Sequence, residues 1–432
     1  MEIYEWSRLD EEVKQRIRTR SERDVESTIA TVRHIVDEVR ANGDAACRKF
    51  TKELDKVALS GIEIAVGSEE FAKASEILPR SVKTALTDAI EHVEKFHETQ
   101  RPEGFTFVET SAGMYVAERA TPVPSAGLYI PRGRGCFPSM LYMLAIPAKI
   151  AGVSRICIAT PPLSDGSVDP ACLYAAELCG VNEVYRIGGA QAVAALAYGT
   201  DSIRPVTKIV GPGSAFVTAA KRLVYGDVDV GLPAGPSESV ILADSHASPW
   251  KVALDLTIEA EHGEDSQSLL VTPSAEIARR VAELLEELVA DLPEPRKSFV
   301  TTVFETYGGI VVVDSMDDAI TLINDIAPEH LSIQTAEPFV ELSRIEHAGE
   351  ILIGEHTPFS LANYAAGANA VLPTGGKART YSPVSVRDFT KYTSVVYATS
   401  EALSETGETV STLADYEGFP AHARAIRNRA GD

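Results

Sequence analysis

The sequence predicts an α/β protein built on parallel β-sheets. Short β-branched segments alternate with segments of helical periodicity, as where 155–160 is followed by 170–179. A second set with the same alternation begins at 239–243. Strands that are separated by single helices at this spacing are typical of βαβ units, whose strands run parallel.

The first hundred residues have the periodicity of helices. One helix is expected from Asp24 to about Gly43, and a second one is expected over 81–100. The apolar residues that recur at helical spacing in the first helix are Ile29, Val32, Ile35, Val36 and Val39.

The two βα sets follow in order. The first set has expected strands at 155–160, 183–187 and 208–210, and expected helices at 170–179, 190–198 and 215–225. The second set has expected strands at 239–243, 268–271, 309–313 and 350–353, and expected helices at 250–261, 275–289 and 319–326. The last fifty residues lack the alternation and predict a small helical appendage.

Composition narrows the class of protein. The chain has 432 residues, 45% of them hydrophobic, and a net charge of −22 at pH 7. At roughly 150 residues per domain, this length suggests two or three domains with a sizeable core. Such an acidic chain repels phosphate groups, which argues against nucleic-acid binding and against binding to an anionic membrane surface.

The N-terminus and the cysteines predict a cytoplasmic location. The segment from Met1 to Trp6 has neither the basic start nor the apolar stretch of a secretory signal. The five cysteines are scattered without a CxxC pair, which is typical of reduced thiols. We therefore expect a cytoplasmic enzyme.

Two Glu-x-x-His pairs are candidate metal ligands. Glu259 and His262 are three residues apart near a helix end, so both side chains lie on one face and can share a metal ion. Acidic helix ends with a histidine also occur without a metal. The second pair, Glu94 and His97, would fit a di-iron helical bundle, but the strand-rich middle of the chain favours a solvated amphipathic helix there.

Glu329 and His330 form a candidate acid–base pair. Imidazole titrates near neutral pH, and a partly buried carboxylate can accept a proton from water, so adjacent groups can divide proton transfers. The alternative is a turn whose histidine merely caps or packs.

Glycine-rich turns and two arginines are candidate anion sites. The turns at 188–191, 211–214 and 235–237 follow expected strands and can present backbone amides to an anion. None of them has the GxGxxG dinucleotide pattern, and ordinary βα turns would look similar. Arg132 and Arg134 can bind a phosphate or an anionic substrate, or can lie in a surface loop.

Eight short stretches, taken together, resemble the histidinol dehydrogenase family in the same order over nearly the whole chain. They lie at 127–131, 187–194, 208–213, 234–238, 260–267, 327–331, 371–374 and 416–422. The third is Lys-Ile-Val-Gly-Pro-Gly, and the sixth is Ala-Pro-Glu-His-Leu.

The resemblance implies two incomplete Rossmann-like domains with small helical appendages in a domain-swapped homodimer. It places an N-terminal helical arm at 1–25 and a discontinuous first Rossmann-like domain at 26–128 and 236–384. A second, NAD-binding Rossmann-like domain follows at 129–235. A C-terminal helical appendage at 385–432 would reach the partner subunit, so that the active sites lie at the subunit interface.

The resemblance also implies a zinc-dependent oxidation of L-histidinol to L-histidine with two NAD molecules. By carry-over, His330 would be the base and Glu329 would activate water. Tyr129, Gln191 and Ser214 match NAD-contacting positions. The implied substrate contacts are Ser237, Glu259, His262, His330, Asn363, Glu417 and His422. The implied zinc ligands are Glu259, His262, Asn363 and His422, the last from the partner subunit.

Several positions depart from the family pattern. Glu259 stands where the family has a zinc-binding Gln, and Asn363 stands where it has a zinc-binding Asp, so a carboxylate and an amide have exchanged places. Ala370 replaces a His, Ser214 replaces an NAD-contacting Asn, and Arg132 replaces a Gly. These changes suggest a paralogue with an altered substrate site.

Two alternatives to histidinol oxidation therefore remain. The first keeps the chemistry but acts on another, possibly anionic, alcohol such as sulfopropanediol, with Arg132 or Arg134 pairing with the anion. The second is a catalytically silent dimeric family member. The retained Glu329 and His330 argue against the second.

Overall fold

The computed structural model describes residues 2–19, 25–133 and 135–429. Its contacts divide the chain into two units, which are described separately below. The first unit comprises Met1–Gln100 and Val123–Phe389, and the second comprises Arg101–Pro122 and Thr390–Asp432. No helix within the described ranges is both long and apolar enough to cross a membrane.

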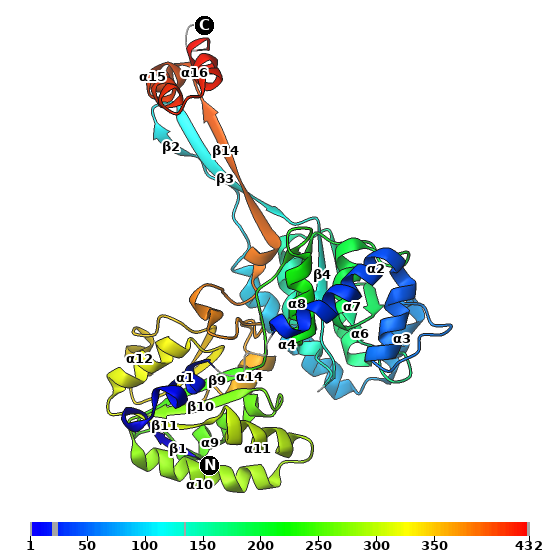
Figure 1. Ribbon diagram of the computed structural model, residues 1–432, viewed down its shortest axis with the longest axis vertical. Helices are drawn as coiled ribbons and strands as arrows, with labels where there is room; N and C mark the ends of the chain where they lie inside the picture. The colour runs from blue at the N-terminus through cyan, green and yellow to red at the C-terminus, as the bar shows by residue number, and fades with distance from the viewer. Residues whose placement is uncertain (1, 20–24, 134, 430–432) are drawn as a thin grey trace. The chain divides into compact units, whose positions relative to one another are not determined.

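One sheet of the first unit has five parallel strands in the order β6-β5-β4-β7-β8. Figure 1 labels its strand β4. Its strands are β4 (Ser125–Tyr129), β5 (Arg155–Thr160), β6 (Glu183–Arg186), β7 (Lys208–Val210) and β8 (Asp229–Val230). Its helices are α2 (Val25–Leu54), α3 (Ser68–Ile77), α4 (Arg80–Glu98), α5 (Pro138–Ala151), α6 (Pro170–Leu178), α7 (Gly189–Tyr198) and α8 (Ala215–Val224).

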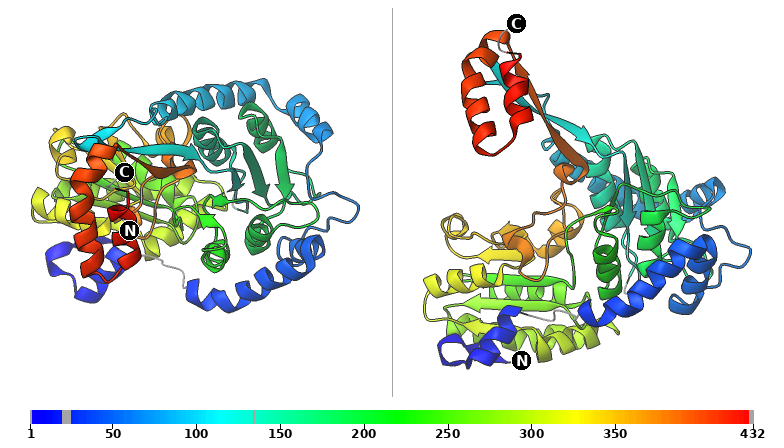
Figure 2. Two further views of the ribbon diagram at one scale, coloured as in Figure 1. Left: turned by 90° about the horizontal axis from the view of Figure 1, so that it is seen from above. Right: turned by 45° about the horizontal axis from the view of Figure 1, so that its top comes forward.

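Helices cover both faces of this sheet, as further views show (Figure 2). Residues of α3 to α6 pack with Leu128 and Ile158 in one core, and residues of α2, α7 and α8 pack with Cys157 and Ala159 in another. Neighbouring residues of β5 thus enter different cores. A strand buried on both faces needs an apolar residue at nearly every position, which explains the continuous β-branched runs in the sequence.

The other sheet of the first unit has six parallel strands in the order β1-β11-β10-β9-β12-β13. Its strands are β1 (Ile3–Glu5), β9 (Glu238–Ala243), β10 (Gln267–Thr272), β11 (Gly309–Val312), β12 (His330–Gln334) and β13 (Glu350–Ile353). Its helices are α1 (Glu11–Thr19), α9 (Pro249–Ala260), α10 (Ala275–Asp291), α11 (Arg296–Thr306), α12 (Met316–Ile326), α13 (Pro338–Leu342) and α14 (Phe359–Tyr364). Three short 3₁₀ helices of the unit are η1 (Trp6–Arg8), η2 (Lys377–Arg379) and η3 (Val386–Phe389).

This second sheet repeats the double-sided burial. Ile241 and Leu270 pack with α9, α10 and α11 on one face, while Val240 and Leu269 pack with α12 on the other. Two parallel sheets covered by helices on both faces confirm the predicted α/β fold class.

The grouping of elements in the first unit differs from the predicted domain bounds. The prediction placed 26–128 in the first Rossmann-like domain. In the structure, β4 is a strand of the five-stranded sheet, and helices α2 to α4 pack on that sheet. The predicted arm at 1–25 includes β1, which pairs with β11, and its residues 1 and 20–24 lie outside the described ranges. Periodicity predicts that a helix forms, but it does not indicate which sheet the helix covers.

The second unit contains a three-stranded antiparallel sheet in the order β14-β3-β2 and two helices. Its elements are β2 (Val108–Ser111), β3 (Met114–Pro122), β14 (Thr390–Ala398), α15 (Ser400–Tyr416) and α16 (Pro420–Arg427). The prediction of a purely helical appendage missed β14. The β-branched and aromatic residues of that segment favour a strand once β3 provides a partner.

The expectation of a solvated helix around Glu94 was wrong for His97. This histidine lies on the buried face of α4 and is fully buried. Its Nδ1 lies 2.8 Å from Gln100 Oε1, and Asn369 Nδ2 lies 3.3 Å from its Nε2. Burial lowers the pKa of His97, so the side chain acts as a neutral core residue.

Candidate active site

The first unit contains a pocket of about 660 Å³ that is lined from both of its sheets. Lining residues on one side follow the carboxyl ends of β4 and β7, and lining residues on the other side lie at the amino ends of β9 and β12. Each of these strand pairs is adjacent at the point where the strand order of its sheet reverses. In α/β sheets such a reversal point leaves a crevice for ligands outside the carboxyl ends of the strands, which here is the side of β4 and β7.

Glu329 and His330 lie at the start of β12 and line the pocket. His330 Nδ1 is 2.9 Å from Glu350 Oε2, and its Nε2 is 3.9 Å from Glu329 Oε1. Glu329 Oε2 accepts a hydrogen bond of 2.8 Å from the backbone N–H of Glu238. The imidazole also packs edge-on against Phe359, with 5.8 Å between ring centroids. His330 is thus the first residue of a buried strand rather than part of a turn.

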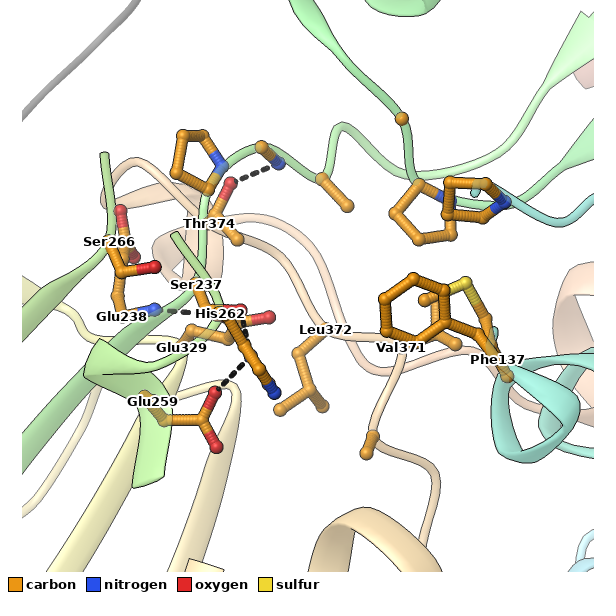
Figure 3. A pocket seen from close by; sticks show the side chains of 18 of the residues that line it. Phe137, Ser237, Glu238, Glu259, His262, Ser266, Glu329, Val371, Leu372 and Thr374 are labelled. Carbon is orange, nitrogen blue, oxygen red and sulfur yellow. Dashed lines mark hydrogen bonds and ion pairs between the residues drawn. The ribbon is translucent and has the colours of Figure 1, made fainter. Parts of the chain in front are cut away.

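A second cluster forms at the end of α9, which carries Glu259 in its last turn. Figure 3 shows Glu259 and Ser237 close to His262. Glu259 Oε1 accepts a hydrogen bond of 2.7 Å from Asn363 Nδ2 on α14, and Glu259 Oε2 forms an ion pair of 2.9 Å with His262 Nδ1. The same nitrogen is 2.9 Å from Ser237 Oγ.

The charges in the second cluster are set by mutual interaction. Burial raises the pKa of Glu259, but the charges of His262 and His330 and the hydrogen bonds from His262 and Asn363 outweigh burial and lower that pKa to about 2. Burial lowers the pKa of His262, but the charge of Glu259 outweighs this effect and raises that pKa. Glu259 is therefore a buried anion, and its charge favours the protonated form of His262.

In the Glu329–His330 pair at the start of β12, the pKa of the carboxyl group shifts in the direction opposite to that of Glu259. Burial raises the pKa of Glu329 well above its usual range, although the nearby His330 opposes the shift. Burial lowers the pKa of His330, but the charge of Glu259, the hydrogen bond to Glu350 and the charge of Glu329 raise it to about 10. His330 therefore holds a proton at neutral pH and becomes a base only when the negative charge around it is offset.

The residues of the second cluster fit a divalent cation. Glu259, His262 and Asn363 offer a carboxylate, an imidazole and an amide, which are metal-ligating groups. Glu259 is 0% exposed, and apart from its contact with His262 its Oε2 has no hydrogen-bond partner among the described residues, so an acceptor position is left over. The described residues contain no group of three or more His, Cys, Asp or Glu side chains that could hold a metal ion; in this cluster the third donor is an amide.

Glu417 and His422, the remaining predicted ligands, belong to the second unit. Glu417 follows α15, His422 lies on α16, and both are exposed. The ring of His422 packs against Phe419, with 5.2 Å between centroids. The resemblance assigns both residues to a site completed by a partner chain, so their roles remain predictions.

The three residues predicted to contact NAD lie in different environments. Ser214 lines the pocket, whereas Tyr129 and Gln191 do not. The Tyr129 hydroxyl is buried and accepts a hydrogen bond of 3.0 Å from the backbone N–H of Gly189. Gln191 is fully buried and donates from Nε2 to Asp55 Oδ2 at 3.2 Å. The structure thus brings only one of the three to the pocket surface.

The turn before Ser214 requires glycine. Gly211 has φ +132°, and a Cβ at this position would approach the carbonyl oxygen of Tyr129 to 2.1 Å. The buried side chain of Lys221 also donates a hydrogen bond to the Gly211 carbonyl. The turn after β7 therefore lies directly against the end of β4, at the crevice between these strands.

Two further positions that depart from the family pattern, Arg132 and Ala370, line the pocket, as Ser214, Glu259 and Asn363 do. Arg132 Nη1 donates a hydrogen bond of 3.0 Å to the carbonyl oxygen of Pro162. Arg134, the other predicted anion-binding arginine, lies outside the described residues.

Sequence reasoning missed Glu350 and Glu238. Glu350 on β13 contacts His330 on the neighbouring strand β12. The side chain of Glu238 accepts a hydrogen bond from the backbone N–H of Gly375, and its backbone N–H donates to Glu329. Nothing in the local sequence of either residue indicates these contacts. They follow from which strands are neighbours and in what register.

The sequence of this chain is similar to a family model and to proteins of known sequence over nearly its whole length. The family model for histidinol dehydrogenase matches residues 18–430. A histidinol dehydrogenase of Synechocystis sp. is 46% identical, over 99% of this chain and 98% of its own length. A histidinol dehydrogenase homolog of Rhizobium meliloti is also 46% identical, over 98% of this chain and 93% of its own length.

A solved structure agrees with these sequence relatives. The crystal structure of histidinol dehydrogenase from Elizabethkingia anophelis matches with a TM-score of 0.93 and 33% identity, covering 99% of this chain and 97% of the other. The resemblance inferred from eight short stretches is thereby confirmed, and so is the prediction of a dehydrogenase enzyme. Because the matches run through both sheets and the residues that line the pocket, the chain belongs to the histidinol dehydrogenase family.

Proposed function

We propose that this protein is a zinc- and NAD-dependent dehydrogenase that oxidises L-histidinol through the aldehyde to L-histidine. The observation that carries the proposal is one pocket that holds both the Glu329–His330 pair and the donor set of Glu259, His262 and Asn363. Proton transfer and binding of a polar alcohol can then occur within a single pocket.

In this proposal His330 accepts the proton of the substrate hydroxyl through Nε2, the nitrogen that does not face Glu350. Glu329 then positions and deprotonates the water that attacks the aldehyde, because its carboxyl group lies on the same pocket wall. Each of the two oxidation steps transfers one hydride to one NAD, so the conversion of alcohol to carboxylate consumes two NAD and one water.

Glu259, His262 and Asn363 would hold zinc, together with His422 of a partner chain. Bound zinc would polarise the substrate hydroxyl and offset the negative charge of Glu259 that raises the pKa of His330. Ser237, beside His262, and the partner's Glu417 would contact the substrate. The ligand set keeps one carboxylate and one amide, so exchanging their positions leaves its formal charge unchanged.

The dinucleotide would bind along the turns that follow β4 and β7. Ser214 precedes the first turn of α8, where free backbone amides favour a phosphate group. Tyr129 and Gln191 would support this site from the core of the five-stranded sheet. The proposal includes a domain-swapped homodimer, because two of the assigned ligands come from the second unit of a partner.

A second candidate is oxidation of an anionic alcohol such as sulfopropanediol. Arg132 and Ala370 on the pocket wall favour it, since one adds a guanidinium and the other removes an imidazole relative to the family pattern. A guanidinium binds sulfonate or carboxylate groups well.

The two candidates are distinguished by NADH formation from zinc-loaded protein with L-histidinol and with sulfopropanediol. Two NADH formed per L-histidinol supports the first candidate, and no NADH from this alcohol rejects it. If the anionic alcohol is the substrate, Arg132→Gly should raise its KM at least about tenfold. Arg204→Gly, which removes an exposed arginine that does not line the pocket, is the control and should leave KM unchanged.

A further inference from the structure

Glu350 and His330 are held side by side by the sheet itself. They are the first residues of β13 and β12, and they are register partners in this parallel strand pair. Parallel register partners that point to the same face have adjacent side chains. Glu350 Oε2 lies 2.9 Å from His330 Nδ1, within hydrogen-bond distance.

The contact is shielded from water. The side chain of His330 is 3% exposed and that of Glu350 is 10% exposed. Phe359, itself fully buried, packs its ring edge-on against the imidazole. A hydrogen bond to a carboxylate in such surroundings is stronger than the same bond in water.

The backbone before β13 explains why the two side chains come so close. Gly349 donates its N–H to the carbonyl oxygen of Pro328, and Glu350 donates its N–H to that of Glu329, both at 2.9 Å. A Cβ on Gly349 would lie 2.6 Å from the Glu329 carbonyl oxygen. Only glycine permits this approach, which aligns Glu350 with His330.

We propose that Glu350 is a positioning residue for His330, which accepts its Nδ1–H and thereby fixes the ring with Nε2 toward the substrate hydroxyl. The inference rests on the proposed function, in which His330 is the base. A neutral imidazole has one donor and one acceptor nitrogen, so a carboxylate on Nδ1 assigns the acceptor role to Nε2. The same carboxylate stabilises the imidazolium that forms when His330 takes the proton.

A merely structural role for Glu350 would have a different signature. If this carboxylate only fills space at the start of β13, its loss should lower stability and leave kcat unchanged. If it positions His330, its loss should lower kcat while the KM for the alcohol changes little, because the substrate is bound chiefly by other residues.

The variants Glu350→Ala, Glu350→Gln and Glu346→Gln separate these roles. Glu350→Ala removes the acceptor and should lower kcat by about tenfold to hundredfold. Glu350→Gln keeps an acceptor oxygen but loses the charge, so its kcat should lie between those of Glu350→Ala and the original protein. Glu346→Gln makes the same charge change four residues earlier, where the side chain is 76% exposed, and should leave kcat unchanged.

A second measurement does not depend on turnover. In zinc-loaded protein labelled with ¹⁵N-histidine, the Nδ1 proton of His330 should give a downfield resonance typical of a hydrogen bond to a carboxylate. His330→Asn assigns this resonance by removing it. Glu350→Ala should abolish the downfield shift, and Glu346→Gln should retain it.

The outcomes keep the two proposals distinguishable. Loss of the downfield resonance together with a lower kcat in Glu350→Ala supports the positioning role. An unchanged resonance, or an unchanged kcat in a protein that His330→Asn inactivates, overturns that role while the proposed function stands. If the original protein oxidises neither alcohol, the proposed function fails, and a retained resonance in Glu350→Ala then overturns the positioning role independently.

Discussion

The two sides of the pocket come from sheets of the same kind but contribute different chemistry. The side of the five-stranded sheet comprises the turns after β4 and β7, with small residues such as Gly213 and Ser214, and residues of the helices α5 and α8. The side of the six-stranded sheet presents ionisable groups at the amino ends of its strands, among them Glu238, Glu329 and His330.

The direction of the strands accounts for this difference. The carboxyl end of a parallel strand leads into a helix N-terminus, where unpaired amides and the helix dipole favour an anion. The six-stranded sheet meets the pocket with the opposite end, so a helix C-terminus arrives there, and α9 brings Glu259 with it. The dipole opposes a carboxylate at that position, so Glu259 depends on His262 or a bound cation. Backbone amides and arginines line one side of the pocket, and acidic side chains and imidazoles line the other.

If proton transfer is carried out by side chains of the six-stranded sheet, replacing the proposed base His330 should have the largest effect. We expect His330→Asn to lower kcat about 10²–10⁴-fold, because asparagine cannot accept the hydroxyl proton. Steady-state NADH formation measures the change. His347→Asn, in the loop before β13, is the control. A kcat within a few-fold of the original would assign the base to another residue.

The exchanged carboxylate and amide provide a test of the metal site. Glu259→Gln should weaken zinc binding at least about tenfold, because it removes the anionic ligand. The double variant Glu259→Gln with Asn363→Asp restores one carboxylate and should recover most of the affinity. Competition with a chelating dye measures zinc affinity without turnover. Equal affinities for the single variant and the original protein would remove Glu259 from the ligand set.

A change in the turn after β7, on the side of the five-stranded sheet, should affect the binding of NAD rather than proton transfer. Gly211→Ala places a Cβ 2.1 Å from the Tyr129 carbonyl oxygen, so the turn must move; we expect a loss of about 1–3 kcal/mol of stability and a higher KM for NAD. Gly226→Ala also has positive φ but meets no atom within 4 Å, so it isolates the effect of the clash. Matching behaviour of the two variants would show that the close approach is unimportant.

A pH dependence of stability is expected in chelator-treated protein. The pKa of His330 is about 10 in the folded protein, above about 6.5 in an unfolded chain. Its contribution to stability is therefore fully present below about pH 6.5 and is lost as the pH rises towards 10. Denaturant unfolding between these pH values should show a steeper loss in the original protein than in His330→Asn. Parallel curves would contradict the raised pKa.

Much of the site could be predicted, but only where neighbours in sequence are neighbours in space. The spacing of Glu259 and His262 places them together on α9, and Glu329 and His330 are adjacent in the chain. Glu350 could not be found this way, because its contact depends on the pairing of β12 with β13. The continuous apolar strands predicted the parallel sheets, whereas the sheet that each early helix covers depends on packing that periodicity does not encode.

The second unit is assembled from two stretches of chain that are far apart in sequence. Its central strand, β3, pairs with β14 on one side and with β2 on the other. A chain that ended at Phe389 would keep β2 and β3 but leave one edge of β3 without a partner. A two-stranded hairpin is marginally stable in water, and an open edge invites pairing with other molecules. We therefore expect that shortening the carboxyl-terminal segment compromises solubility before it affects either parallel sheet.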